Sequence, residues 1–298
     1  MTSHAPIAIP ADVRSRLKAL RLLPRRARGT HGIGQHASRS RGAGLEFAQY
    51  RAYEPGDELR QIDWKLYARS DRFFVRESER ESPVTVWVLV DTSASAAQAD
   101  RAHPQWSRLD HACATAACLV ELALQQGDRF GLIAVGGDGV RLVPAGSGPR
   151  QRDRVHLLLR QLRARGGWPP AHLLRPVWER VQAGDMLVAL GDGFDDAGTA
   201  LLERLAAARR EVMHIQLLSA EERDFPFTDG HRFRDPETGE ELLGDGRAIR
   251  DAYLARFEQA QRALHARLQG AGIAAATGYL DQPLDAPLRA LFAPGAAA

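Results

Sequence analysis

The chain has 298 residues, of which 44% are hydrophobic and 26% are charged, a composition typical of a globular protein with one large domain or one large and one small. The net charge is only +3, and no apolar run approaches the roughly 20 residues of a membrane-spanning helix, which excludes an integral helical membrane protein. The N-terminus also lacks the compact apolar core of a secretory signal, so we expect a cytoplasmic protein.

The first 44 residues form a basic segment. They hold nine Arg and Lys side chains against a single acid, Asp12, so the remainder of the chain carries a net charge of −5. Val13, Leu17 and Leu20 recur at helical spacing, which predicts a helix over 10–23. Gly, Ser and Arg dominate the stretch that follows, which is typical of a flexible linker, and we therefore treat 1–44 as a basic arm.

The sequence leaves three roles open for this arm. The first is a solvated, mobile terminus. The second is docking of residues 10–28 on a partner or a membrane surface. The third is binding of nucleic-acid phosphates by its arginines. Because arginine is the dominant basic residue along the whole chain, the arm is not distinctive enough to make nucleic acid the expected partner.

A polar and aromatic segment, 45–82, follows the arm and ends in an expected exposed strand over 72–81. From residue 83 the pattern alternates between short apolar runs and helix-length segments. The expected strands are 84–90, 128–135, 140–143, 185–190, 211–217 and 273–279, and the expected helices are 106–126, 150–163, 171–181, 197–209, 247–269 and 284–292. This alternation predicts an α/β domain over 83–292, with a mostly parallel sheet covered by helices on both faces, and a disordered tail over 293–298.

Hydroxyl and carboxylate side chains follow two of these strands directly. Asp91, Ser93 and Ser95 come after the strand 84–90, and Asp192 comes after the strand 185–190. If the two strands are neighbours, all four side chains emerge at the carboxyl edge of the sheet, where ligands of open α/β sheets bind. Such oxygen donors suit a hard divalent cation such as Mg²⁺, Mn²⁺ or Ca²⁺, of which we expect Mg²⁺.

The spacing of Asp91, Ser93 and Ser95 after a buried strand resembles the metal-ion-dependent adhesion site of von Willebrand factor type A domains. This resemblance implies a Rossmann-like fold and a metal that docks an acidic side chain of a partner, with Asp192 as the later aspartate. The family completes its site with a threonine after a Gly-Gly pair. Here Trp168 follows Gly166 and Gly167, so the site binds the metal more weakly, or a water, Asp195 or Asp196 substitutes for the threonine.

The segment before the first strand is more specific. Its turn 55–57 and the polar run 60–65, together with Tyr53, resemble the signature of domain-of-unknown-function family 58. Later features agree with this resemblance: the run 217–222, the run 235–239, and Tyr253 in a long helix. The resemblance covers about residues 45–292 and implies a partnership with a MoxR-type AAA+ ATPase in the assembly or metal loading of a client protein complex.

The residues of the signature segment allow two interpretations, one structural and one catalytic. The first is a charge network around Tyr53 and Trp64 that fixes local structure or contacts a partner. The second is a Mg²⁺-dependent nuclease, in which Asp57 and Asp63 hold the metal and Lys65 orients a water. The nuclease needs its carboxylates on buried strands, whereas these flanks are polar, so we favour the network.

Other chemistry is not indicated. The sequence has no phosphate-binding G-x-x-x-x-G-K-[ST] loop, no H-E-x-x-H motif and no zinc-type spacing of Cys and His. Cys113 and Cys118 lie five residues apart in an apolar helical stretch, which predicts two buried thiols and no disulfide. The sequence therefore predicts a non-enzymatic assembly factor without a small-molecule substrate.

Overall fold

The computed structural model describes residue 7 and residues 9–22, 49–54, 57, 59–77, 84–137 and 139–293. The chain divides into two compact units, of which the smaller comprises Gly29–Pro83 and the larger comprises Met1–Arg28 with Val84–Ala298. The linker predicted over 24–44 and most of the predicted tail over 293–298 lie outside the described residues.

The larger unit is built around one six-stranded sheet with the strand order β10-β7-β6-β3-β4-β5. Its strands are β3 (Thr85–Asp91), β4 (Arg129–Gly136), β5 (Gly139–Gly146), β6 (Met186–Gly191), β7 (Glu211–Leu218) and β10 (Ala274–Tyr279). All neighbours are parallel except β4 and β5, which form the expected antiparallel hairpin across the turn at 136–139. The mostly parallel α/β sheet predicted from the sequence is confirmed.

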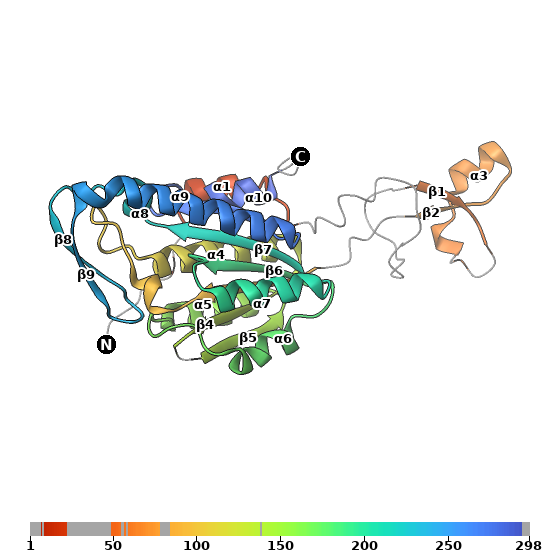
Figure 1. The fold of residues 1–298 in the computed structure, drawn as a ribbon. Helices are drawn as coiled ribbons and strands as arrows, with labels where there is room; N and C mark the ends of the chain where they lie inside the picture. The colour runs from red at the N-terminus through yellow and green to blue at the C-terminus, as the bar shows by residue number, and fades with distance from the viewer. Residues whose placement is uncertain are drawn as a thin grey trace. The chain divides into compact units, whose positions relative to one another are not determined.

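Helices cover both faces of this sheet (Figure 1). They are α1 (Ala11–Leu17), α4 (Arg108–Gln126), α5 (Pro149–Gln161), α6 (Arg175–Arg180), α7 (Asp196–Ala207), α8 (Ala220–Asp224), α9 (Gly246–Gly270) and α10 (Ala286–Phe292), with the short 3-10 turns η2 (Ala94–Ala97) and η3 (Ala171–Leu174). Pro176, in the first turn of α6, separates this helix from η3, so the single helix predicted over 171–181 is two pieces.

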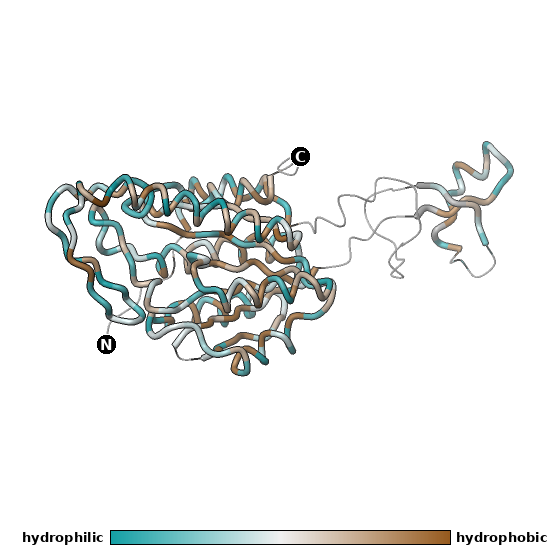
Figure 2. The backbone as a smooth tube through the Cα atoms, viewed as in Figure 1, coloured by the Kyte–Doolittle hydropathy of each residue, from teal (hydrophilic) through white to brown (hydrophobic). Residues whose placement is uncertain are grey.

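The two faces of β3 show how the sequence sets the layers. Val86, Val88 and Val90 face the core that contains α1, α4, α5 and α10, whereas Trp87 and Leu89 face the core that contains α6, α7 and α9. A strand buried on both faces needs a continuous apolar run, which explains the composition of 84–90. Figure 2 shows this pattern as hydrophobic central strands beneath helices whose outer faces are hydrophilic.

The N-terminal helix is part of this core. Val13 and Leu17 of α1 are buried, as are Leu20 and Leu22 beyond it. Arg16 donates from Nε and Nη2 to the two carboxylate oxygens of Asp285, at 2.8 Å each. The structure thus corrects the expected boundary at residue 44, because the helix, which spans Ala11–Leu17 instead of 10–23, has its apolar face against the sheet layer of the larger unit.

The smaller unit contains an antiparallel pair, β1 (Gln49–Ala52) and β2 (Phe74–Glu77), with the turn η1 (Leu59–Gln61) and the helix α3 (Trp64–Ser70). A hairpin in the larger unit, β8 (Gly230–Arg234) with β9 (Glu241–Asp245), also arises in a stretch for which the sequence predicted no strands. Its side chains are mostly exposed, so the apolar alternation that reveals a half-buried strand is weak. In the described part of the chain, no helix has the length and apolar character needed to cross a membrane.

Candidate functional site

The loop after β3 presents the predicted oxygen groups at the carboxyl edge of the sheet. Asp91 ends the strand, and its Oδ1 accepts a hydrogen bond of 2.8 Å from the backbone N–H of Ser93. The hydroxyls of Ser93 and Ser95 lie 3.0 Å apart. Asp91 and Ser93 are buried, so the loop offers two hydroxyls and one carboxylate in a largely water-excluded corner.

Asp192 reaches the same edge because β6 lies directly beside β3. The two strands pair in parallel, with Val90 opposite Leu190, so their ends emerge together. A side chain at Gly191 would come within 2.8 Å of Cβ of Asp91, which shows how closely the two strand ends approach. Burial and the nearby Asp192 raise the pKa of Asp91 to about 6. The strands β3 and β6 are therefore adjacent, which is the condition under which Asp91 and Asp192 were expected at one edge.

The loop that holds Trp168 is also brought to the edge, as the resemblance implied. Arg165 N–H donates to the carbonyl of Thr92 at 3.0 Å, and Ala94 N–H donates to the carbonyl of Gly166 at 2.6 Å. Trp168 and Asp91 line the same small pocket beneath the edge. An indole thus stands where an oxygen ligand was expected.

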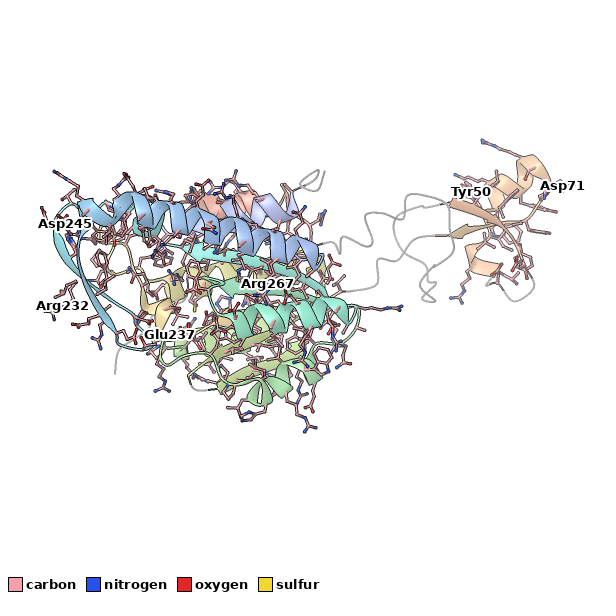
Figure 3. The ribbon with its side chains drawn as sticks, in the orientation of Figure 1. Tyr50, Asp71, Arg232, Glu237, Asp245 and Arg267 are labelled. Atoms are coloured by element: carbon pink, nitrogen blue, oxygen red, sulfur yellow. The ribbon has the colours of Figure 1, made fainter. Side chains whose placement is uncertain are left out.

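The two proposed substitutes for the missing threonine differ in position. Asp195 lines the same pocket and caps α7, since its Oδ1 accepts from the N–H of Gly198 at 2.8 Å. Asp196 is exposed, pairs with Arg267 of α9 at 2.8 Å and does not line the pocket (Figure 3 labels Arg267). Asp195 is thus the carboxylate that remains available near Asp91.

A buried arginine, which the sequence analysis missed, lies at the centre of the site. Arg108 is 3% exposed; its Nη1 donates to Oδ2 of Asp192 at 2.6 Å and its Nη2 contacts both carboxylate oxygens of Glu222 at 2.6 and 2.7 Å. Nη1 also donates to the carbonyl of Ser95 at 3.1 Å. The one sequence signal for this role is an arginine that opens an otherwise apolar helix, and it did not reveal the partners.

A pocket of about 510 Å³ opens over this edge. One wall is aromatic and includes Phe225, Phe233 and Tyr253, and the hydroxyl of Tyr253 donates to the carbonyl of Glu222 at 3.1 Å. The runs 217–222 and 235–239, on which the family resemblance rested, both contribute to the lining. Segments that are remote in sequence therefore meet at the Asp91 loop.

A histidine lies beneath the edge. His214 on β7 is buried, and a side chain at Gly193 would come within 2.9 Å of its Nε2. Burial lowers the pKa of His214 to about 4, so the imidazole is neutral at pH 7. Its two ring nitrogens have no hydrogen-bond partner among the described residues.

The donor set fits a hard divalent cation. The separation of the two serine hydroxyls matches the ~3 Å edge of an octahedron with Mg²⁺–oxygen distances near 2.1 Å. No three His, Cys, Asp or Glu side chains in the described segments form a metal cluster, so the hydroxyls are needed as ligands. Asp91, Ser93 and Ser95 would hold the cation, and Asp192 would join them only in competition with Arg108. A bound cation supplies a positive charge with open coordination positions.

The nuclease candidates in the smaller unit have structural roles. Asp63 caps α3, since its Oδ1 accepts from the N–H groups of Lys65 and Leu66 at 2.9 and 3.0 Å. Asp57 accepts from the N–H of Glu54 at 2.9 Å within its own turn. Lys65 is exposed, so the structure gives no support to a joint metal site of these residues.

The smaller unit also carries an aromatic cluster, in the segment for which a charge network was expected. Tyr67 stacks on Phe73 with ring centroids 4.5 Å apart, and Trp64 packs edge-on against both. Trp64 nevertheless remains 59% exposed. Pro55, Gly56 and Glu81 of the signature lie outside the described residues.

Comparisons with known proteins agree with the family resemblance. The model of the family described as "Protein of unknown function DUF58" matches residues 49–263. An uncharacterised protein of Mycobacterium bovis is 31% identical over 252 residues, which cover 80% of this chain and 76% of that protein. Uncharacterised proteins of two Mycobacterium tuberculosis strains match to the same extent.

Solved structures with a similar sheet are more distant. The conserved hypothetical protein BatB from Bacteroides thetaiotaomicron is 15% identical, with a TM-score of 0.38, and the match covers 63% of this chain and 98% of BatB. The SpRpn10 VWA domain is 14% identical, with a TM-score of 0.40, and the match covers 70% of this chain and 95% of that domain. The mostly parallel sheet agrees with the fold class that the resemblance implied, and because the family model matches more than half of its length, the chain belongs to the DUF58 family.

Proposed function

We propose that this chain is a non-enzymatic protein-interaction factor that docks a partner at the carboxyl edge of its sheet through a divalent cation. Asp91, Ser93 and Ser95 hold the cation, with Asp192 as a further carboxylate of the site, and an acidic side chain of the partner takes an open position. The observation that carries the proposal is the meeting of this oxygen-lined loop with a large pocket. The partner we infer is a MoxR-type AAA+ ATPase that acts with this chain on a client complex.

The electrostatics of the pocket support a cation-dependent role. Seven carboxylates and two guanidinium groups line it, so the pocket carries an excess of negative charge. An acidic partner would be repelled by this surface, and a bound divalent cation would reverse the local sign at the point of contact. Binding should therefore depend on the cation.

A binding assay tests the proposal. The tagged full chain is mixed with a purified MoxR-type AAA+ ATPase of the same organism, in Mg²⁺ or in EDTA. We expect binding in Mg²⁺ alone and its loss in Asp91→Ala. Asp196→Ala is the matched control, because it removes an exposed aspartate that pairs with Arg267 rather than with the edge. Binding that persists in both EDTA and Asp91→Ala would contradict the proposal.

A further inference from the structure

The turn of the β8–β9 hairpin carries an acidic side chain to the Asp91 loop. Glu237 and Ser93 line the same pocket, and the Ser93 side chain lies near enough to influence the Glu237 carboxyl group. Its Oε2 lies 3.3 Å from where the Cβ of any side chain at position 167 would be, so Gly167 leaves room for this carboxylate. Figure 3 shows Glu237 at the tip of the hairpin, beside the segment that follows β3.

The turn is built to hold Glu237 in this direction. Oδ1 of Asp235 accepts from the N–H groups of Glu237 and Thr238 at 2.8 and 3.2 Å. The N–H of Gly239 donates to the carbonyl of Asp235 at 2.9 Å, and Gly239 has a φ of 76°, which favours glycine. These bonds fix the backbone on both sides of Glu237 and limit the positions of its carboxylate.

An aromatic cluster anchors the hairpin to the body of the larger unit. Phe233 of β8 stacks on Phe225 with ring centroids 5.6 Å apart, and Phe225 stacks on Tyr253 of α9 at 4.3 Å. Phe227 packs edge-on against Phe225 and Phe233. Packing therefore holds the hairpin over the pocket, so Glu237 does not belong to a loose surface loop.

Negative charge exceeds positive charge around Glu237, because seven carboxylates but only two guanidinium groups, those of Arg108 and Arg234, line the described part of this pocket. Asp192 and Asp195 are among these carboxylates. Arg108 is already bonded to Asp192 and Glu222 at 2.6 Å each. Carboxylates gathered in this way repel one another unless a cation lies between them. Ser93, which lines the pocket with Glu237, supplies one of the oxygens that would hold that cation.

We propose that Glu237 is a ligand of the cation at Asp91, Ser93 and Ser95, and so takes the position that a partner's acidic side chain would fill. This inference rests on the proposed function, because it needs the cation site. The hairpin then closes the docking edge from within the same chain. A partner has to displace Glu237 from the cation, which makes the hairpin the element that sets the affinity for acidic partners.

Terbium luminescence provides a direct test, since Tb³⁺ prefers oxygen ligands and the indole of Trp168 beside Asp91 can sensitise it. The full chain is titrated with Tb³⁺, and Mg²⁺ is then added as competitor. We expect Glu237→Gln to weaken Tb³⁺ and Mg²⁺ binding at least ~10-fold, which is the effect of losing one charged ligand worth about 1.4 kcal/mol. Glu240→Gln, a matched loss of charge in the same turn, should leave both affinities unchanged.

Hydrogen exchange of the turn gives a second readout that does not depend on luminescence. Mg²⁺ should slow the exchange of the amides of 235–240 in the wild-type chain and in Glu240→Gln, but not in Glu237→Gln. Equal slowing in all three proteins would mean that the cation does not engage Glu237.

The variants separate this inference from the proposed function. If Asp91→Asn loses Tb³⁺ binding while Glu237→Gln and Glu240→Gln both bind Tb³⁺ as tightly as the wild-type chain, Glu237 is not a ligand. The cation site itself is then retained. Unchanged binding in Asp91→Asn would overturn the cation site itself and the role of Glu237 with it. Circular dichroism of each variant shows whether the fold is retained.

Discussion

The guanidinium of Arg108 balances two carboxylates in a region where little water reaches. It is 3% exposed and bonds to Asp192 and Glu222 at 2.6 Å each. Removing one partner from such a group leaves uncompensated charge, which costs far more than an exposed ion pair contributes. At the scale of single residues, Arg108 therefore holds together the strand end of β6 and the helix α8.

Arg108→Met should lower the free energy of unfolding by about 3–5 kcal/mol, because Asp192 and Glu222 are left facing each other without their cation. Urea denaturation followed by circular dichroism measures this loss. Arg262→Met is the control, because Arg262 pairs with Glu258 on the exposed side of α9. This substitution should leave the free energy of unfolding unchanged. Equal stabilities of the two variants would show that the buried network is not held by Arg108.

Asp91 should make stability depend on pH in a defined direction. Its pKa in the fold is about 6, above the ordinary value of 3.8, so the native state keeps a proton that the unfolded chain has lost. The free energy of unfolding therefore falls as pH rises from about 4 to about 6, in the absence of divalent cations. Asp91→Asn should lack this decrease.

The difference in stability between the wild-type chain and Asp91→Asn isolates the contribution of Asp91 to the pH dependence. His111 and His214 are buried with pKa values lowered to about 4, and they cost stability as pH falls below about 6.5, which is the opposite slope. Both histidines are present in both proteins, so their contribution cancels in the difference. Urea denaturation in EDTA from pH 4 to pH 7.5 gives that difference, and parallel curves would show that Asp91 titrates normally.

At the scale of elements, α1 behaves as a part of the core and not as an arm. Leu17 is fully buried against the layer of α4, and Arg16 ties the helix to Asp285 at the start of α10. We expect Leu17→Ala to destabilise the larger unit by about 2–5 kcal/mol, the range for a buried leucine. Lys18→Ala, one residue on and exposed, should have no effect. Urea denaturation of both variants measures this effect. Equal urea midpoints for the two variants would show that α1 is not part of the core.

The β8–β9 hairpin should open more easily than the sheet. Its strands contribute no residue to the two buried core clusters in the described part of the chain, and its main anchor is the stack of Phe233 on Phe225. Phe233→Ala should speed the hydrogen exchange of amides in 230–245 while leaving the exchange of β3 and β6 unchanged. Faster exchange throughout the sheet would instead show that the hairpin belongs to the cooperative core.

At the scale of the whole molecule, the response to a cation should be confined to one unit. Every residue of the proposed cation site belongs to the larger unit. At a Mg²⁺ concentration of 100 times the dissociation constant, the larger unit should gain about 2.7 kcal/mol. Hydrogen exchange should slow around Asp91 and Asp192 and stay the same over 49–77. No change anywhere, or the same change in Asp91→Asn, would contradict this expectation.

Local patterns determined most of the architecture. The apolar run before Asp91, buried on both faces, could only be an inner strand of a covered sheet, and the alternation with helical segments required parallel neighbours. The same reasoning put Asp91 and Asp192 at one edge on the condition that their strands are neighbours, and the structure meets this condition. The strand order and the hairpin at 136–139 agree with it. Periodicity carries this information because burial of one face repeats within a few residues.

The partners of each charge were decided by tertiary structure alone. Arg108 meets Asp192 and Glu222 across 84 and 114 residues, and Arg16 meets Asp285 across 269. No local pattern encodes such pairs, because a charged residue near a helix end looks the same whether it is solvated or buried. The sequence by itself thus determined the sheet and the edge at which Asp91 lies, whereas packing decided that Arg108 and Glu237 share that edge and that α1 belongs to the core.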